Sequence, residues 1–156
     1  MTGAPTFRLV PLARLKSHER IEPKKVDALV DEIRARGVFD DPIWVARGSD
    51  VILNGHHRVA ALRRLGAVRV PAWVFDYDDG GIALDRWGPG PPLSKEEVVR
   101  RGRSGRLYPP KTTRHRLTTE LPARPTPLAR LFDGPPRQSR GSKPSRPRAS
   151  GASGPG

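Results

Sequence analysis

Hydrophobic residues recur at helical spacing in two segments of the chain. In the first segment they stand three or four positions apart, at Val26, Leu29, Val30 and Ile33. Pro23 opens this segment, where its missing N–H costs little, and Gly37 stands where a helix normally closes. The second segment repeats at Val59, Leu62 and Leu65 and is followed by Gly66. The pattern predicts one helix from Glu22-Pro23 to Gly37 and another that begins at His56 and His57.

Short apolar runs between turn residues predict strands. They lie at residues 8–10, 43–45, 51–53 and 70–75, with a further short strand at 82–84. The runs 43–45 and 51–53 flank the turn at 47–50 and are expected to form a hairpin. Together with the helices they give the order β, α, β, β, α, β, which is typical of a small mixed α/β (α+β) domain built on a curved sheet.

The last third of the chain changes character. Ser94 and Glu97 have the spacing of a capping box, so a third helix is expected to run to about Arg101. Residues 111–115 are expected to form a polar loop. Pro, Arg, Gly and Ser dominate from about residue 121 onward, which predicts a domain over residues 1–120 and a disordered tail over residues 121–156.

The charge follows the same division. Of the net +13, residues 1–97 carry 15 Lys/Arg against 14 Asp/Glu, whereas residues 98–156 carry 14 against 2. An Arg-rich tail of this kind binds polyanions without sequence preference, so non-specific contact with nucleic acid is one expectation. No apolar run reaches the roughly 20 residues that span a bilayer, so we expect no membrane partner and a cytoplasmic protein.

The composition also excludes several chemistries. The chain has no Cys, which removes disulfides, thiol nucleophiles and iron–sulfur clusters. The four His do not form a zinc pattern, because His56 and His57 are adjacent and point about 100° apart on a helix. No metal site made of protein ligands is therefore predicted.

The junction between the strand at 51–53 and the second helix is the strongest candidate site. Its residues are Asn54, Gly55, His56, His57 and Arg58. The first turn of a helix offers unpaired N–H groups and a positive dipole end, so this turn is suited to a phosphate or carboxylate. The alternative is that Asn54 only caps the helix, since Asn is a favoured N-cap residue.

Two more polar groups stand at element boundaries, at residues 17–19 and 111–115. Either group alone could be a solvated loop. Together with residues 54–58, however, they resemble the ParB/sulfiredoxin superfamily, most closely its small branch of free L-serine kinases. The matching stretches span about residues 7–120, and the run Pro109-Pro110-Lys111-Thr112-Thr113-Arg114-His115 is what favours the kinase branch.

The resemblance implies an adenine nucleotide, ADP or ATP, used with Mg²⁺ to phosphorylate a small hydroxy amino acid, most simply L-serine. It implies a catalytic group of Glu19, Asn54 and His57, in which Glu19 is the general base. The implied phosphate-binding residues are Gly55, His56, His57, Arg58, Lys111, Thr112, Thr113, Arg114 and His115. Trp87 falls near a family tryptophan beside the amino-acid pocket.

One position departs from the branch, which typically has Asp where this chain has Asn54. An amide cannot accept a proton and binds Mg²⁺ weakly. A catalytically weak, ParB-like nucleotide-binding regulator, associated with DNA through the tail, therefore stands as the alternative to an active kinase. Chromosome partitioning is disfavoured, because partition proteins need a helix-turn-helix after the nucleotide domain and residues 121–156 are too rich in Pro to form one. Sulfiredoxin chemistry is excluded because it needs a Cys where this chain has His56.

Overall fold

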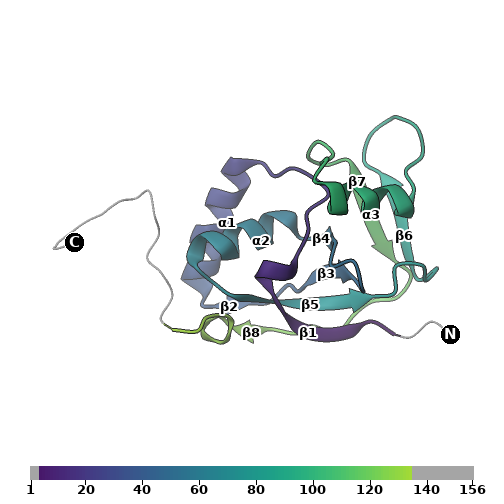
Figure 1. Cartoon of the computed structure of the whole chain (residues 1–156). Helices are drawn as coiled ribbons and strands as arrows, with labels where there is room; N and C mark the ends of the chain where they lie inside the picture. The colour runs from purple at the N-terminus through teal and green to yellow at the C-terminus, as the bar shows by residue number, and fades with distance from the viewer. Residues whose placement is uncertain (1–3, 135–156) are drawn as a thin grey trace.

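The computed structural model describes residues 4–134 and places a four-stranded sheet at the centre of the fold (Figure 1). The strand order is β1-β5-β3-β4. β1 (Thr6–Pro11) runs antiparallel to β5 (Arg69–Phe75), β5 runs parallel to β3 (Ile43–Ala46), and β3 turns back into β4 (Ile52–Asn54). The hairpin expected from the two short apolar runs is therefore confirmed.

Two helices pack together on one side of this sheet, as Figure 1 shows. They are α1 (Pro23–Arg36) and α2 (His56–Leu65). Val26, Val30 and Ile33 of α1 are buried in one core with Leu62 and Leu65 of α2. Both helices end at a glycine in the left-handed conformation, Gly37 and Gly66, as the sequence pattern predicts.

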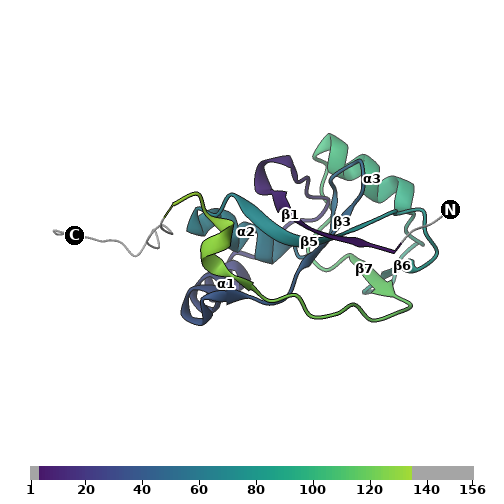
Figure 2. The same cartoon turned by 90° about the horizontal axis from the view of Figure 1, so that it is seen from below.

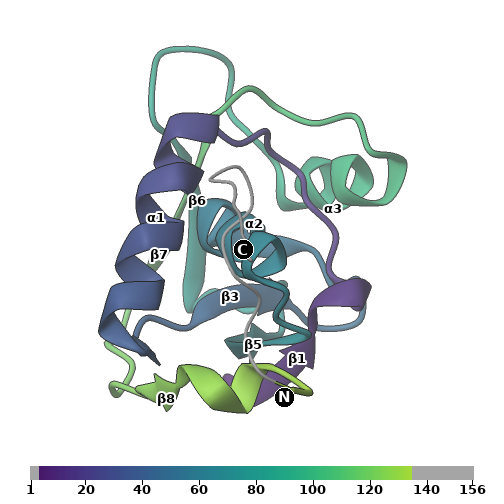
Figure 3. The same cartoon turned by 90° about the vertical axis from the view of Figure 1, so that its left-hand side faces the viewer.

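A second group of elements lies at the end of the sheet away from α1 (Figure 1), and Figure 3 shows its helix α3 on the opposite side of the molecule from α1. β6 (Ile82–Arg86) pairs with β7 (Thr113–Leu117), and α3 (Lys95–Ser104) begins at Ser94, whose hydroxyl accepts from the Glu97 N–H. The third helix is thus confirmed and runs three residues further than expected. The loop predicted at 111–115 is wrong for its second half, because Thr113 to His115 belong to β7. A short 3₁₀ helix (Leu12–Arg14) follows β1.

The chain from residue 126 to residue 132 closes the main core. β8 (Thr126–Pro127) pairs with β2 (Val38–Phe39), and a 3₁₀ helix (Leu128–Leu131) follows it. Figure 2 shows this yellow-green segment beside α1. Its side chains Leu128, Leu131 and Phe132 are buried in the main core, and the Val68 N–H donates to the Leu131 carbonyl.

The prediction of a disordered tail from residue 121 is therefore wrong for this segment. Its few apolar residues are separated by Pro and Arg, so no helical or strand periodicity in the sequence predicts that they are buried. The remainder of the predicted tail, residues 135–156, lies outside the described residues, and its contact with nucleic acid stays a prediction. The expected α/β fold with three main helices and a mixed sheet is confirmed for residues 4–134. None of the helices in this range is long and apolar enough to cross a bilayer.

Candidate functional site

The turn from β4 into α2 has the geometry of an open anion site. Gly55 is the N-cap of α2, with a φ of 112°, and no side chain caps the helix. A Cβ at this position would lie 2.5 Å from the Ile43 Cγ2 and 3.1 Å from the Arg58 Nη2, so only glycine fits. The alternative in which Asn54 caps the helix is wrong. Asn54 is an exposed residue at the end of β4, and Gly55 occupies the N-cap position instead. The N–H groups of residues 56–58 are left for another partner.

A cavity of about 230 Å³ lies at this turn. Most of the residues proposed from the sequence line it, including the complete run from Asn54 to Arg58. They are joined there by Glu19, Trp87, Lys111 and Thr113, which come from three other segments of the chain. Lys25 of α1 and Leu53 also line the cavity and were not expected there. Lys25 could have been found only from knowledge that the start of α1 faces the start of α2.

Backbone pairing explains why Glu19 meets residues 111–113. The Tyr108 N–H donates to the His18 carbonyl and the Arg20 N–H donates to the Tyr108 carbonyl, which fixes the loop before α1 against the loop before β7. The Glu19 carboxylate then accepts four hydrogen bonds. Oε2 accepts from the Lys111 N–H at 3.0 Å, and Oε1 accepts from the N–H of Thr112 at 3.3 Å and from the N–H and hydroxyl of Thr113, both at 2.9 Å. These bonds fix the orientation of the carboxylate.

The two adjacent histidines of α2 point to different neighbours, as their spacing predicts. The His56 Nε2 accepts from the His18 N–H at 3.2 Å, and the His57 Nε2 accepts from the Glu22 N–H at 2.8 Å. Burial lowers the pKa of His56 well below its ordinary value, and the neighbouring His18 lowers it further. Burial, followed by the charge of Lys25, also lowers the pKa of His57. Both rings are therefore neutral near pH 7 and carry their proton on Nδ1.

His18 belongs to the polar group at residues 17–19 but was not among the site residues predicted from the sequence. It is fully buried, with an exposed fraction of 0%. Its Nδ1 lies 2.7 Å from the Ile52 carbonyl oxygen and its Nε2 lies 2.8 Å from the Thr113 hydroxyl. Burial lowers the pKa of His18, while the charge of Glu19 opposes that change. The only signal in the sequence was its position next to Glu19.

Arg58 is held mainly by the protein itself. Its guanidinium donates to the carbonyls of Asp41 and Pro42, and it lies 3.3 Å from the Asp41 carboxylate. Burial lowers the pKa of Arg58, an effect that the Asp41 charge opposes. Arg58 therefore fixes the turn before β3 and adds positive charge to the cavity wall.

Three of the residues proposed for phosphate binding do not line the cavity. The Thr112 hydroxyl donates to the Pro109 carbonyl. The Arg114 guanidinium lies 4.7 Å from the centre of the Trp87 ring, and Trp87 is 55% exposed at the cavity. His115 is buried behind the site, with its Nε2 2.6 Å from the Tyr77 hydroxyl, and burial lowers its pKa to about 3. Alternation along β7 explains only the position of Arg114, which faces the opposite side from Thr113, whereas His115 faces the same side as Thr113 but lies two residues further along the strand.

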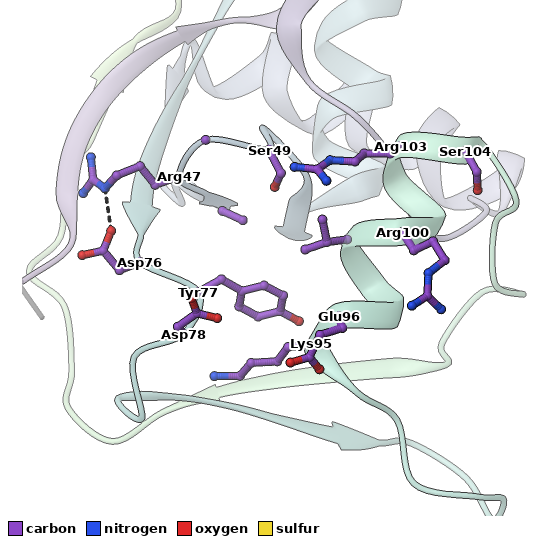
Figure 4. Close-up of a pocket in the computed structure, with 13 residues that line it drawn as sticks. Arg47, Ser49, Asp76, Tyr77, Asp78, Lys95, Glu96, Arg100, Arg103 and Ser104 are labelled. Carbon is purple, nitrogen blue, oxygen red and sulfur yellow. Dashed lines mark hydrogen bonds and ion pairs between the residues drawn. The ribbon is translucent and has the colours of Figure 1, made fainter.

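A larger cavity, of about 1040 Å³, lies elsewhere, between the β3–β4 turn, the end of β5 and α3 (Figure 4). None of the residues proposed from the sequence lines it. Two of its charged groups pair with each other, Arg47 with Asp76 at 2.8 Å, and the Lys95 Nζ donates to two backbone carbonyls. Size alone favours this cavity, but the uncapped start of α2 and the Glu19 carboxylate lie together in the smaller one.

The described residues contain no group of three or more His, Asp or Glu that could hold a metal ion. In the smaller cavity, the oxygen ligands suited to Mg²⁺ are the Glu19 carboxylate and the Asn54 amide oxygen. Such a pair can contribute to a magnesium site only together with oxygens from a ligand, which is how Mg²⁺ is commonly held beside phosphates.

Comparison of the sequence with known proteins finds curated relatives, although no family model matches the chain. The ADP-dependent L-serine kinase SerK of Thermococcus kodakarensis is 33% identical over 99 residues, which cover 61% of this chain and 41% of SerK. The ATP-dependent L-serine kinase of Staphylothermus marinus is 40% identical over 85 residues, covering 52% of this chain and 34% of that protein. The matches thus span about two fifths or less of these relatives' length.

Solved structures with the same fold agree with these relatives. A free serine kinase in complex with AMP superposes with a TM-score of 0.72 at 20% identity, covering 85% of this chain and 95% of that chain. A C-terminally truncated SbnI from Staphylococcus aureus gives a TM-score of 0.73 at 16% identity, over 81% of this chain and 89% of that chain. The resemblance inferred from the sequence motifs is confirmed.

Proposed function

We propose that this chain, a relative of the L-serine kinases within the ParB/sulfiredoxin superfamily, is a nucleotide-dependent kinase that converts free L-serine to O-phospho-L-serine. One observation carries the proposal. The Glu19 carboxylate and the uncapped N-terminus of α2 line the same 230 Å³ cavity. A phosphoryl transfer to a hydroxyl needs these two elements together, a place for the phosphates and a base for the hydroxyl.

The phosphates of the nucleotide would sit at the start of α2. The N–H groups of residues 56–58 point out of the helix there, and its dipole adds partial positive charge. Lys25, Arg58 and Lys111 line the same cavity and bring three formal positive charges. His57, whose Nε2 is occupied by the Glu22 N–H, offers its Nδ1–H as a neutral donor.

Glu19 would remove the proton from the serine hydroxyl. Its Oε1 accepts three of the four hydrogen bonds, so Oε2, which accepts only the Lys111 N–H, keeps a lone pair for the substrate. The same bonds hold the carboxylate in one orientation, and correct orientation is a large part of the rate in phosphoryl transfer. Trp87, exposed at the cavity, would form the outer wall of the amino-acid pocket.

Mg²⁺ would be held mainly by the nucleotide, with Asn54 and Glu19 as the nearest oxygen ligands of the protein. It would neutralise charge on the transferred phosphoryl group. Asn54 adds no charge to this set, whereas an Asp would. We therefore expect Mg²⁺ to bind this site more weakly than it would bind a site with a carboxylate at position 54.

The test is ³¹P NMR of the purified protein with Mg²⁺, L-serine and either ADP or ATP. We expect a phosphoserine signal that is lost in Glu19→Gln and retained in Glu32→Gln, which removes an exposed carboxylate of α1 outside the cavity. Asn54→Asp should transfer faster at low Mg²⁺. Absence of phosphotransfer from both the native chain and Asn54→Asp, with either nucleotide, would refute the kinase proposal.

The second candidate is a nucleotide-binding regulator with little or no catalysis, which Asn54 in the cavity favours. It predicts that nucleotide protects the native chain against thermal unfolding while phosphoserine forms only in Asn54→Asp. Equal turnover by the native chain and Asn54→Asp would exclude this candidate.

A further inference from the structure

The excess positive charge of this chain is not confined to its predicted tail. Of the 14 Lys and Arg in residues 98–156, nine lie in the described part of the chain, and residues 4–134 as a whole carry 24 Lys/Arg against 16 Asp/Glu. Residues 98–116 contain seven of these cations and no Asp or Glu. They cover most of α3, the loop that follows it and most of β7. The folded domain thus has a strongly basic segment of its own.

The loop before α1 brings more cations next to this segment. It runs beside the loop that follows α3 (Figure 3). Backbone hydrogen bonds hold the two loops together, since the Arg20 N–H donates to the Tyr108 carbonyl and the Tyr108 N–H donates to the His18 carbonyl. Arg20 therefore lies beside the loop that also carries Arg106.

A second contact joins the loop before α1 to α3 itself. Lys16 pairs with Val51 in an isolated bridge, and the Ile52 N–H donates to the Lys16 carbonyl at 2.8 Å. The side chain of Val51 packs against Gly102 of α3, where an added Cβ would lie 2.5 Å from the Val51 Cγ2. Lys16 and the end of α3 are therefore both in contact with Val51.

Four exposed cations from these elements form what we call the basic band: Lys16, Arg20, Arg103 and Arg106. None of the four forms an ion pair with another residue in the range 4–134. The adjacent acid, Glu19, turns its carboxylate to the N–H groups of residues 111–113. By contrast, Arg100 and Arg101 of α3 both pair with Glu97. The band therefore carries positive charge that no described residue neutralises.

An exposed aromatic ring lies at one end of the band. Trp87 is 55% exposed and lines the 230 Å³ cavity together with Lys111, which follows Tyr108 in the loop after α3. The Trp87 N–H donates to the Thr112 carbonyl, which fixes it beside that loop. Proteins that bind single-stranded nucleic acid combine these two elements, cations along the phosphate backbone and aromatic rings on which bases stack.

We propose that the basic band binds the phosphate backbone of a single-stranded nucleic acid, one base of which stacks on Trp87. A duplex fits this surface less well, because its bases are stacked on each other and do not reach the Trp87 ring. The contact does not require residues 135–156, and it does not depend on the proposed phosphotransfer.

Fluorescence anisotropy of a labelled oligo(dT) of about 15 nucleotides, titrated with the complete chain, measures this binding. The band variant combines Lys16→Gln, Arg103→Gln and Arg106→Gln. Each cation that meets a phosphate of a single strand adds about 0.7 to the slope of log Kd against log salt concentration, which is about fivefold in affinity at about 0.1 M salt. We therefore expect the band variant to bind about 100-fold more weakly, with a slope smaller by about 2.

Two variants that lose the same charge separate the band from total charge and from the tail. The surface control replaces three exposed cations that have no ion pair within residues 4–134, by Arg8→Gln, Arg34→Gln and Arg130→Gln. The tail control combines Arg137→Gln, Arg140→Gln and Arg146→Gln. A larger loss in the band variant than in the surface control supports the proposal, whatever the tail control adds. Equal losses in those two variants, or a loss in the tail control alone, would overturn it.

Trp87→Leu tests whether the partner is single-stranded. We expect it to weaken oligo(dT) binding about tenfold, the size expected for one stacked base, and to leave the salt slope unchanged because no charge is removed. Binding of a duplex of the same length should not change. Unchanged affinity for oligo(dT), or an equal loss for the duplex, would overturn the assignment of a single-stranded partner.

Discussion

Replacement of Gly55 by Ala should cost more than replacement of any glycine that only needs a positive φ. Gly55 has a φ of 112°, and the added Cβ would meet the Ile43 Cγ2 at 2.5 Å and its Cβ at 2.9 Å. Ile43 is fully buried in the main core, so it cannot move away freely. The substitution therefore combines backbone strain with overpacking.

The two contributions can be estimated separately. A non-glycine residue in the left-handed region costs about 1–2 kcal/mol, and overpacking a core costs about 1–3 kcal/mol. Gly55→Ala should then lower the free energy of unfolding by about 2–5 kcal/mol. Gly48, with a φ of 86° and no atom within 4 Å of its added Cβ, carries only the backbone contribution. Gly48→Ala should cost about 1–2 kcal/mol.

Urea unfolding followed by circular dichroism measures this difference. The two variants differ by the overpacking cost of about 1–3 kcal/mol, so with a slope of about 1–3 kcal/mol per molar urea the midpoint of Gly55→Ala should lie about 0.3–3 M below that of Gly48→Ala. The variant should also lose nucleotide binding, because displacement of Ile43 or Arg58 moves the start of α2. Midpoints that agree within error for the two variants would refute the close-approach argument.

Three further predictions concern the supporting elements. Gly102→Ala should lower the free energy of unfolding by about 1–3 kcal/mol despite the better helix propensity of Ala, because the added Cβ would lie 2.5 Å from the Val51 Cγ2. In the Val51→Ala background the same substitution should cost less, and urea unfolding measures both costs. Ser94→Ala should cost about 1 kcal/mol, since it removes the hydroxyl that accepts the Glu97 N–H, and an unchanged midpoint would exclude a role for this cap. Burial gives His115 a folded-state pKa of about 3, below its unfolded value near 6.5, so the unfolded state binds the proton first and the free energy of unfolding falls as the pH falls from 6.5 toward 3. From pH 6 to pH 4 the native chain should lose about 1 kcal/mol per pH unit relative to His115→Gln. Parallel plots of the free energy of unfolding against pH for the two proteins would contradict this.

The helices and most strands could be predicted because their signals are local. Pro23 and Gly37 mark the ends of α1, and the apolar run at residues 70–75 marks β5, which is buried along almost its whole length. β2 and β8 could not be predicted, since each is only two residues long and forms only through pairing with the other. Residues 113–117 alternate between buried and exposed, but the polar side chains of this strand conceal the pattern.

The site was partly predictable for the same reason. Residues 54–58 are consecutive, so the sequence alone predicts both the glycine turn and the start of α2 at this place. The role of His18 depends on Ile52 and Thr113, which lie 34 and 95 positions away, and no local pattern contains such a distance. His115 looked like part of a phosphate loop because β7 was not recognised; it lies two residues beyond Thr113 on the same face of that strand, where its Nε2 contacts the Tyr77 hydroxyl.

The pairing of β2 with β8 also determines when this protein can finish folding during synthesis. Thr126 pairs with Phe39 and is translated about 90 residues after it. At a synthesis rate of about 5–20 residues per second, the face of the main core that Leu128 and Leu131 cover stays open for about 5–20 s after Phe39 has been made. Variants that stop before residue 126 would leave that face uncovered permanently, and we expect them to be captured by chaperones or to aggregate.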